Sequence, residues 1–201
     1  CGNPSQKVEI VLVGGTNGKS STIHFASKLL EEEGYKTGTV TSGHFLSFNE
    51  RISTGLQSIS NKNFAETAGK VLDLASENKI SATTFEVMLV TALLYFESES
   101  VKVALLEVGM GGKLDATTAF NPIIAAITRV TKGNKDEELG RDLDLVSYEM
   151  MGIAKKDTWL ISAEQSKLRL QKMKTFADDK EYKWAMPIRK LAPLPYIFEQ
   201  L

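Results

Sequence analysis

Short apolar runs alternate along this chain with stretches in which apolar residues recur every three or four positions. The short runs predict buried strands over 7–13, 36–41, 102–108, 122–128, 158–162 and 182–188. The helical spacing predicts helices over 19–33, 63–78, 84–97, 139–155 and 165–178. Strands that alternate with helices indicate an α/β fold, in which a mostly parallel sheet carries helices on both faces.

Two segments fall outside this alternation. Residues 42–61 are rich in serine, asparagine and glycine, and a connection of that length is usually functional or mobile. The end of the chain, KLAPLPYIFEQL, contains two prolines and resembles a linker. We therefore expect one domain over 1–190, followed by a linker over 191–201.

Composition and charge narrow the classes of protein. The 201 residues suffice for one α/β domain with its own core. Because 24 Lys and Arg residues balance 25 Asp and Glu residues, neither a nucleic acid nor a membrane is expected as a partner, and no apolar run is long enough to span a bilayer. The single cysteine, Cys1, excludes an internal disulfide and fits the cytoplasm. A chain that starts at Cys1 is expected to be a fragment or to lack its first residues.

The sequence GGTNGKSS, residues 14–21, follows the first predicted strand and opens the first predicted helix. Backbone N–H groups in such a turn point inward, and the helix N-terminus adds partial positive charge, so this combination binds phosphate. Lys19 would reach the β- and γ-phosphates, and Ser20 or Ser21 could contact Mg²⁺. The general nucleotide-loop pattern has a glycine where this chain has Val13. The alternative is therefore a tight strand–helix turn with an exposed lysine.

Four further segments carry a resemblance to a known family. They are TSGHFLSFNERIS (41–53), TTFEVMLVTALLYF (83–96), ALLEVGMGGKLDATTAF (104–120) and LG…GIAKK (139–156). With GTNGK, their order and spacing resemble the folylpolyglutamate synthase/dihydrofolate synthase branch of the Mur ligase family. In that family GTNGK is the phosphate loop, which accounts for Val13. The resemblance implies a P-loop NTPase-like central domain, with a C-terminal ligase domain that this chain lacks.

The activity implied by the resemblance is that of an ATP-dependent amide ligase. A folate or dihydropteroate carboxylate would take the γ-phosphoryl group of ATP, and the amino group of L-glutamate would then attack the acyl phosphate. Phosphoryl transfer depends mainly on positioning and charge neutralisation, which suits a lysine-bearing loop and Mg²⁺. The expected partners are these small molecules, and the protein is expected to be a monomer. A central domain alone is not expected to carry out ligation.

The resemblance also assigns roles to residues. Ser42 and Glu107 would hold the metal, and Lys19 and Glu107 would act in catalysis. A hard oxygen ligand at the end of a buried strand suits Mg²⁺. The phosphate cradle would consist of Gly15, Thr16, Asn17, Gly18, Lys19, Ser20 and Ser21, and the acceptor site would include His44, Asn49, Arg51 and Asp115.

Other roles for these residues stay open. Ser42 could cap a turn, and Glu107 could be a buried acid paired with a lysine, although a metal is favoured because a buried carboxylate needs a partner. Residues 49–51 could form a solvated, locally paired segment, and Asp115 could cap a turn. His44 has no partner in the sequence for acid–base chemistry and is expected to be a loop residue near the site.

The chain departs from the family pattern at three positions. Gly43 replaces a proline, which leaves its loop less constrained. The family's second-metal histidine corresponds to Lys135 or Asn134, and a charged lysine cannot ligate a metal. The family's carbamylated lysine corresponds to Met150, whose thioether is a poor partner for Mg²⁺. The first metal site is therefore expected to be intact and the second to be lost.

Three hypotheses are compatible with these departures. The first is an active ligase in which Lys135 supplies, as a fixed cation, the charge of the missing metal. The second is a nucleotide-binding scaffold that has lost ligation, and the third is an unrelated P-loop kinase or ATPase, against which the ordered motifs argue. The intact GTNGK loop, Ser42 and Glu107 favour the ligase. Dihydropteroate and folate are not distinguished as acceptors by the sequence.

Overall fold

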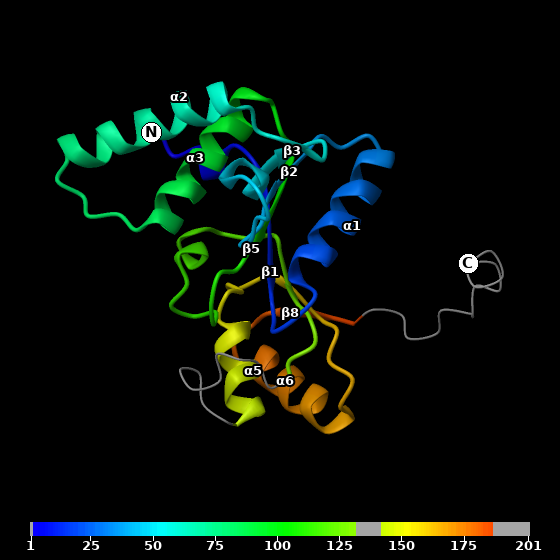
Figure 1. The fold of residues 1–201 in the computed structure, drawn as a ribbon. Helices are drawn as coiled ribbons and strands as arrows, with labels where there is room; N and C mark the ends of the chain where they lie inside the picture. The colour runs from blue at the N-terminus through cyan, green and yellow to red at the C-terminus, as the bar shows by residue number, and fades with distance from the viewer. Residues whose placement is uncertain (1, 132–141, 187–201) are drawn as a thin grey trace.

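The computed structural model describes residues 2–131 and 142–186. Within these ranges, eight strands form one sheet in the order β4-β3-β2-β5-β1-β6-β7-β8 (Figure 1). In this spatial order, each neighbouring pair from β2 through β5, β1, β6 and β7 to β8 is parallel. Strand β3 pairs antiparallel with both β2 and β4. The strands are β1 (Glu9–Gly14), β2 (Thr37–Val40), β3 (Ile52–Thr54), β4 (Gln57–Ser58), β5 (Val103–Glu107), β6 (Ile124–Ile127), β7 (Trp159–Ser162) and β8 (Lys183–Ala185).

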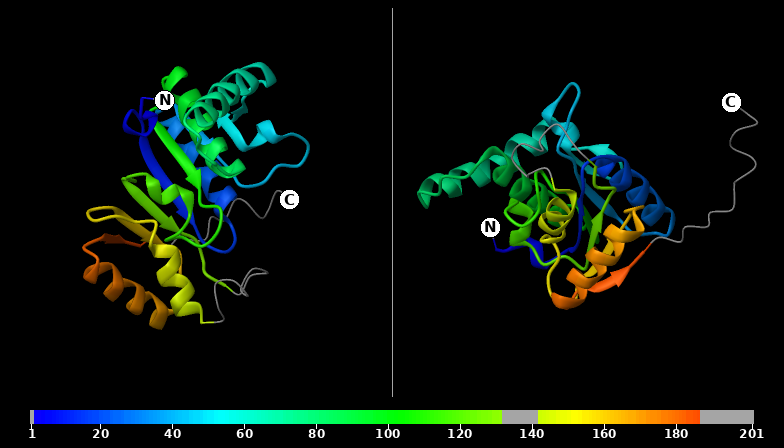
Figure 2. Two further views of the ribbon diagram at one scale, coloured as in Figure 1. Left: turned by 90° about the vertical axis from the view of Figure 1, so that its left-hand side faces the viewer. Right: turned by 90° about the horizontal axis from the view of Figure 1, so that it is seen from below.

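Helices cover both faces of this sheet, which confirms the predicted architecture. Figure 1 shows α1 on one side of the central strands and α2 and α3 on the other, and Figure 2 shows α5 and α6 packed side by side. The α-helices are α1 (Lys19–Glu32), α2 (Asn61–Glu77), α3 (Thr84–Ser98), α5 (Leu143–Met151) and α6 (Lys167–Asp179), and the short 3-10 helices are η1 (Pro4–Gln6), η2 (Phe48–Arg51) and η3 (Ala116–Ala119). No helix in the described ranges is long and apolar enough to cross a membrane.

The two faces of β1 show why the sheet holds helices on both sides. Ile10 and Leu12 belong to the larger apolar core, which also contains buried residues of α3, α5 and α6. The neighbouring residue Val13 is packed with Ile23 of α1 in a second, smaller core. Successive side chains of a strand point to opposite faces, so an apolar run without alternation must be buried on both.

One part of the fold was predicted wrongly. Residues 42–61, expected to be a single long connection, contain η2 and the β3–β4 hairpin, which extends the sheet antiparallel to β2. The hairpin turn has positive φ at both central residues, +54° at Gly55 and +61° at Leu56. Such turns are usually marked by Asn-Gly or Asp-Gly. A leucine at the second position hid the turn from sequence-based reasoning.

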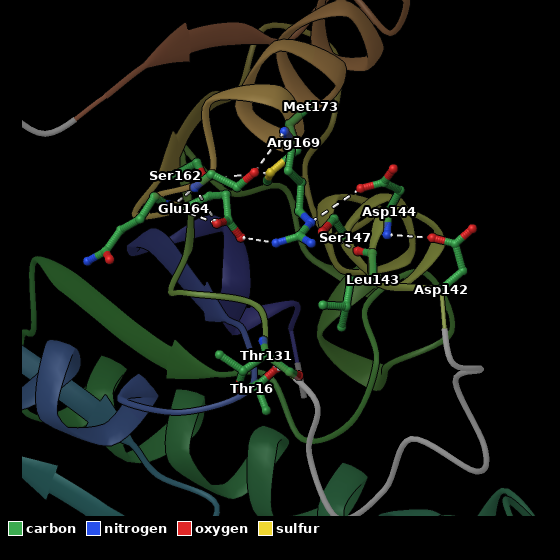
Figure 3. Close-up of polar contacts among 12 residues, drawn as sticks. Thr16, Thr131, Asp142, Leu143, Asp144, Ser147, Ser162, Glu164, Arg169 and Met173 are labelled. Carbon is green, nitrogen blue, oxygen red and sulfur yellow. Dashed lines mark hydrogen bonds and ion pairs between the residues drawn. The ribbon is translucent and has the colours of Figure 1, made fainter.

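A buried acid ties the start of α6 to α5 (Figure 3). Glu164, which is 3% exposed, accepts hydrogen bonds from the Gln165 and Ser166 amides at 2.8 Å each and from Arg169 Nη1 at 3.0 Å. Arg169 also donates through Nε to Asp144, in the first turn of α5, at 3.3 Å. The guanidinium therefore bridges two acids that belong to different segments of the chain.

The bonds to Glu164 also set its protonation. Burial by itself disfavours the charged carboxylate, but hydrogen bonds from the Ser166 amide, the Arg169 guanidinium and the Gln165 amide outweigh this cost. Together they lower the pKa of Glu164 below its ordinary value of 4.5. Ionised Glu164 therefore stabilises the fold, and that stabilisation is complete above the unfolded-state pKa.

We expect Arg169→Ala to lower the free energy of unfolding by about 2 kcal/mol, because hydrogen bonds to charged groups are lost beside a buried acid. Chemical denaturation at pH 7 measures this change. Lys172→Ala is the matched control: it removes a cation that pairs with Asp144 at a more exposed position, and should cost no more than about 0.5 kcal/mol. Equal costs for the two variants would contradict the role given to Arg169.

Acid should weaken the fold partly through Glu164. The lowered pKa means that stability is lost as the pH falls from about 4.5 through the folded-state pKa. Glu164→Gln removes this titration, so its stability deficit relative to wild type should shrink as the pH is lowered from 7 to 3. Unfolding curves of both proteins across that range test the expectation. A deficit independent of pH would show that ionisation of Glu164 does not contribute.

Candidate nucleotide-binding site

Four loops meet where the parallel strands β2, β5, β1 and β6 end at the same edge of the sheet. They begin at Thr41 after β2, at Val108 after β5, at Gly15 after β1 and at Thr128 after β6. Open parallel sheets bind ligands at this edge. The structure therefore brings together the segments that carry the predicted phosphate loop and the predicted metal ligands.

The glycine loop fits tightly against the residue that follows β6. Gly15 has φ of +127°, and a Cβ atom placed on it would lie 1.9 Å from Thr128 Oγ1. Thr128 donates from its backbone N–H to Gly14 O at 2.9 Å. Both the backbone conformation and the space thus require glycine at position 15.

The loop leads into α1 through a residue that leaves the helix N-terminus without a side-chain cap. Gly18, the N-cap residue, has φ of +83° and supplies no such group. The first backbone N–H groups of a helix lack partners within the helix and carry partial positive charge. Beside them lies a pocket of about 230 Å³, lined by Thr16, Asn17, Gly18, Lys19, Ser20, Ser21 and Glu107.

Glu107 connects three of the four loops. It ends β5, is 3% exposed, and accepts hydrogen bonds from Ser42 Oγ at 2.6 Å and from Ser20 Oγ at 2.8 Å. The Ser42 amide adds a third bond to the carboxylate at 3.2 Å. The predicted metal ligands Ser42 and Glu107 are thus adjacent, and Ser20 of the glycine loop joins them.

Lys19 lies beside this carboxylate. Its Nζ atom donates to Gly15 O at 3.1 Å and is 3.9 Å from Glu107 Oε1. The side chain is held by the loop that carries it, with its charge at the pocket. Lys19 is therefore placed to neutralise an anion bound to the loop amides.

The oxygen groups around Glu107 suit Mg²⁺. A carboxylate and the two serine hydroxyls are hard ligands, and Mg²⁺ is commonly held by one or two carboxylates together with substrate phosphates and water. The described ranges contain no group of three or more His, Cys, Asp or Glu side chains that could hold a metal. Glu107 and the serine hydroxyls would therefore supply only part of the ligand shell of a divalent cation, and phosphate oxygens or water would supply the rest.

The side chains of Thr16 and Asn17 are hydrogen-bonded to Thr131, which follows β6. Thr16 Oγ1 donates to Thr131 O at 3.0 Å and accepts from Thr131 N at 3.2 Å. Asn17 Nδ2 donates to Thr131 Oγ1 at 3.4 Å. Both residues line the pocket as predicted, but their polar side-chain atoms also fix the loop itself.

The loop after Ser42 is ordered by its own polar contacts. Glu50 accepts hydrogen bonds from the amides of Phe45, Leu46 and Ser47 at 2.7–2.9 Å. These bonds, that from Phe45 most of all, lower the pKa of its carboxyl below the ordinary value. Phe45 and Leu46 are held at the tip, 99% and 94% exposed. The loop is therefore a defined structure that presents apolar side chains.

Three of the residues predicted to bind the acceptor substrate lie in two parts of the loop after β2. Arg51 Nε donates to His44 Nδ1 at 2.9 Å, so these two residues lie together in the loop after β2. Asn49 instead bonds Ile59 O at 2.8 Å, at the foot of the loop. The local pairing considered for residues 49–51 is thus observed, and an acceptor role for His44, Asn49 and Arg51 stays a prediction.

Asp115 organises the loop after β5. It is 9% exposed and accepts hydrogen bonds from the Gly109 and Met110 amides at 3.0 Å and from Thr117 N and Oγ1 at 2.9 and 2.7 Å. The turn-capping role considered for Asp115 is therefore observed. A direct contact with a substrate stays a prediction.

Lys135 and Met150 are the two residues that, by the family resemblance, replace ligands for the second metal. Lys135 lies outside the described residues. Met150 is 5% exposed and belongs to the large apolar core. Its Cα lies so close to Gly112 that a Cβ on that glycine would be 2.6 Å away. The position that resembles the family's lysine is therefore filled by a packed apolar side chain at the base of the loop after β5.

Comparison with known proteins agrees with this geometry. A family model described as the Mur ligase middle domain matches residues 13–137, more than half of the chain. The chain therefore belongs to the Mur ligase family. The curated relatives that it matches include folylpolyglutamate and dihydrofolate synthases, and so the predicted branch is confirmed as well.

Individual matches give the degree of similarity. A dihydrofolate synthase/folylpolyglutamate synthase of Bacillus subtilis is 31% identical over 99% of this chain and 46% of its own length. The structure of Mycobacterium tuberculosis folylpolyglutamate synthase complexed with ADP matches with a TM-score of 0.82 and 29% identity, covering 92% of this chain and 43% of that one. A bifunctional synthase with Mn, AMPPNP and L-glutamate bound has a TM-score of 0.82, 28% identity, and coverage of 92% and 44%. This chain thus spans less than half the length of these relatives.

Sequence reasoning missed three residues that shape the site. Thr128 and Thr131 follow β6, and Glu50 orders the loop after β2. The two threonines could have been suspected, because any residue just beyond a parallel strand lies at the ligand-binding edge. Glu50 also had a signal, because Ser47 followed three residues later by Glu50 is the pattern of a capping box, which these two residues form at the start of η2.

Gly15→Ala should damage both the fold and the pocket. The added methyl group meets Thr128 and the φ of +127° is unfavourable for alanine, so we expect a loss of about 2 kcal/mol or more in the free energy of unfolding. Gly69→Ala is the matched control, because Gly69 lies inside α2 with open space around it and alanine should be neutral or stabilising by up to about 1 kcal/mol there. A Gly15→Ala protein as stable as wild type would contradict the proposed fit. Thermal and chemical denaturation provide the measurement.

Proposed function

We propose that this chain is the ATP-binding domain of an ATP-dependent amide ligase that adds L-glutamate to a folate or dihydropteroate carboxylate through an acyl phosphate. One observation carries the proposal: the Glu107 carboxylate is held by Ser42 and Ser20 at the mouth of the glycine loop, 3.9 Å from Lys19. The names of the relatives supply the substrate class. Glu107 and the glycine loop lie together at the edge of the sheet where the parallel strands end.

The glycine loop and the start of α1 bind the phosphates. Amides of Gly18, Lys19 and Ser20 would donate to phosphate oxygens, and the Lys19 ammonium would offset the charge on the β- and γ-phosphates. Glu107 and the hydroxyls of Ser42 and Ser20 would hold Mg²⁺, which supplies further charge neutralisation when bound. The residues act by positioning and by electrostatic stabilisation of the transferring group.

The proposed reaction has two balanced steps. A carboxylate oxygen of the acceptor forms a bond to the γ-phosphorus as the bond from that phosphorus to the β–γ bridging oxygen breaks, and ADP leaves with the electron pair. The glutamate nitrogen then bonds to the acyl carbon, the carbon–oxygen bond to the phosphoryl group breaks, and inorganic phosphate and a proton leave. Lys19 stabilises the negative charge that spreads over the phosphoryl oxygens in the first step.

An apolar groove next to the site fits an acceptor with a flat ring system. The groove has a volume of about 420 Å³ and lies between α3 and the loop after β5, with Leu89, Val90, Leu114 and Phe120 among its lining residues. Asp115 also lines it, and Leu114 is 91% exposed. Asp115, which lines the groove, accepts from the Gly109 and Met110 amides just beyond Glu107, so an acceptor held there would face the proposed phosphate site.

A nucleotide-binding protein without ligase activity is the second candidate. The observation that favours it is Met150, which is packed into the apolar core where the family resemblance implies a carbamylated lysine. Glu107, Ser42 and Ser20 nevertheless form a site that a passive scaffold does not need. The ligase is therefore preferred.

We also propose a domain organisation, a cellular location and an oligomeric state for the protein. Residues 1–190 would form the ATP-binding unit, and 191–201 would lead towards a ligase domain like the one that the family resemblance implies. The lone Cys1 supports function in the cytoplasm, and we propose a monomer that binds small molecules and neither nucleic acid nor membrane.

Calorimetric titration of ADP and ATP into the 201-residue chain, with Mg²⁺ and with excess EDTA, tests the proposal. We expect binding that requires Mg²⁺ and that weakens at least about tenfold in Lys19→Ala and in Glu107→Ala, because each loses a charge at the phosphates or the cation. Lys28→Ala is the matched control on the same helix, since Lys28 pairs with Glu32 on the exposed face. It should bind like wild type.

Three outcomes would contradict the proposal. Absence of binding by the folded wild-type chain would reject the nucleotide site. Binding that is independent of Mg²⁺ and unchanged in Glu107→Ala would reject the metal role of Glu107. Glutamate addition to folate or dihydropteroate by the 201 residues alone, measured as ADP release that depends on both substrates, would show that no further domain is needed.

A further inference from the structure

The glycine loop is fastened along its length to the residues that follow β6. At its inner end, Gly14 O accepts from Thr128 N at 2.9 Å and from Thr128 Oγ1 at 3.2 Å. At its outer end, Thr16 bonds to Thr131 (Figure 3), and Asn17 bonds to the same residue. The inner end is fixed by backbone pairing and close packing, whereas the outer end depends on side chains.

The contacts with Thr131 hold the part of the glycine loop that lines the pocket. Thr16 and Asn17 both line it, and Thr131 itself does not. The Thr16 hydroxyl donates to the carbonyl oxygen of Thr131 and accepts from its backbone N–H, so it holds Thr131 through both of its backbone groups. The Thr131 hydroxyl in turn accepts from Asn17 Nδ2 at 3.4 Å.

These contacts have a consequence for Asn17. An amide nitrogen carries two hydrogens, so the one directed to Thr131 leaves a second that can donate elsewhere. In the observed arrangement Thr131 Oγ1 holds the nitrogen end of this amide, so the second Nδ2 hydrogen can donate to a bound phosphate. A phosphate requires donors and repels an amide oxygen.

We propose that Thr131 is a positioning residue for the nucleotide phosphates, acting through the side chains of Thr16 and Asn17. This inference rests on the proposed function, since it names a residue that prepares the same pocket. Residues 14–18 contain three glycines, which cost more conformational entropy to order than other residues. Contacts that order such a loop before the ligand arrives raise affinity without touching the ligand.

The role is separable from a purely structural one because Thr131 is partly exposed and lies outside both apolar cores. Replacing its hydroxyl by a methyl group preserves the shape of the side chain and leaves the backbone bonds to Thr16 in place. Thr131→Val should therefore retain the thermal stability of wild type within about 2 °C and lose only the orientation of Asn17. Thr131→Ala serves as a second truncation.

The experiment is a double-mutant cycle on ADP affinity in the presence of Mg²⁺, using wild type, Thr131→Val, Asn17→Ala and the double variant. We expect Thr131→Val and Asn17→Ala each to weaken binding about 3- to 10-fold, the range of one neutral hydrogen bond. The double variant should bind no more weakly than the poorer single variant, because both changes remove the same interaction. Thr131→Ser should restore affinity to within about twofold of wild type.

The control is Thr175→Val, which removes a hydroxyl that donates to Gln171 O on the exposed side of α6. It should leave ADP affinity unchanged. If wild type binds ADP but Thr131→Val binds equally well, or if the two losses multiply in the double variant, the positioning role is overturned and the proposed function survives. If wild type binds no ADP, the proposed function fails and this inference fails with it.

Discussion

The buried carboxylate of Glu107 is the group on which the arrangement of the site depends. An ionised side chain at the end of a central strand must be paired, since an isolated buried charge is very costly. In this fold the pairing comes from Ser42, Ser20 and Lys19, which belong to the loops after two other strands. Satisfying one acid therefore fixes the relative positions of β5, the β2 loop and the glycine loop.

The need to pair Glu107 also keeps the glycine loop close to the neighbouring strands. Glu107 pairs in register with Val13, so the glycine loop leaves β1 directly beside the carboxylate. On the other side of β1, the residue after β6 packs so closely against Gly15 that no side chain fits there. The loop is thus held between a charged contact on one side and a steric contact on the other.

Sequence reasoning found the parts of this site that are encoded locally. The apolar runs predicted every parallel strand from β1 to β8, and GGTNGKSS predicted the loop and the start of α1. The contact between Ser42 and Glu107 was also anticipated, though from a family resemblance and not from spacing. What could not be predicted depends on backbone groups or unusual conformations. Glu50 binds the Phe45 and Leu46 amides in addition to the Ser47 amide of its capping box, and Leu56 takes a positive φ that its residue type does not signal.

The charge of the pocket argues for a cation as part of nucleotide binding. Among the described residues that line it, Lys19 and Glu107 are the charged ones, and their charges cancel. The uncapped start of α1 adds about half a positive charge, too little to balance the phosphates of a nucleotide. Met150, packed and apolar, offers no ligand for a cation where the family resemblance places a carbamylated lysine. Without a cation, the Glu107 carboxylate would repel the phosphates of a nucleotide. A divalent cation bound to Glu107 would attract them instead, which explains why a buried glutamate lies beside a phosphate loop.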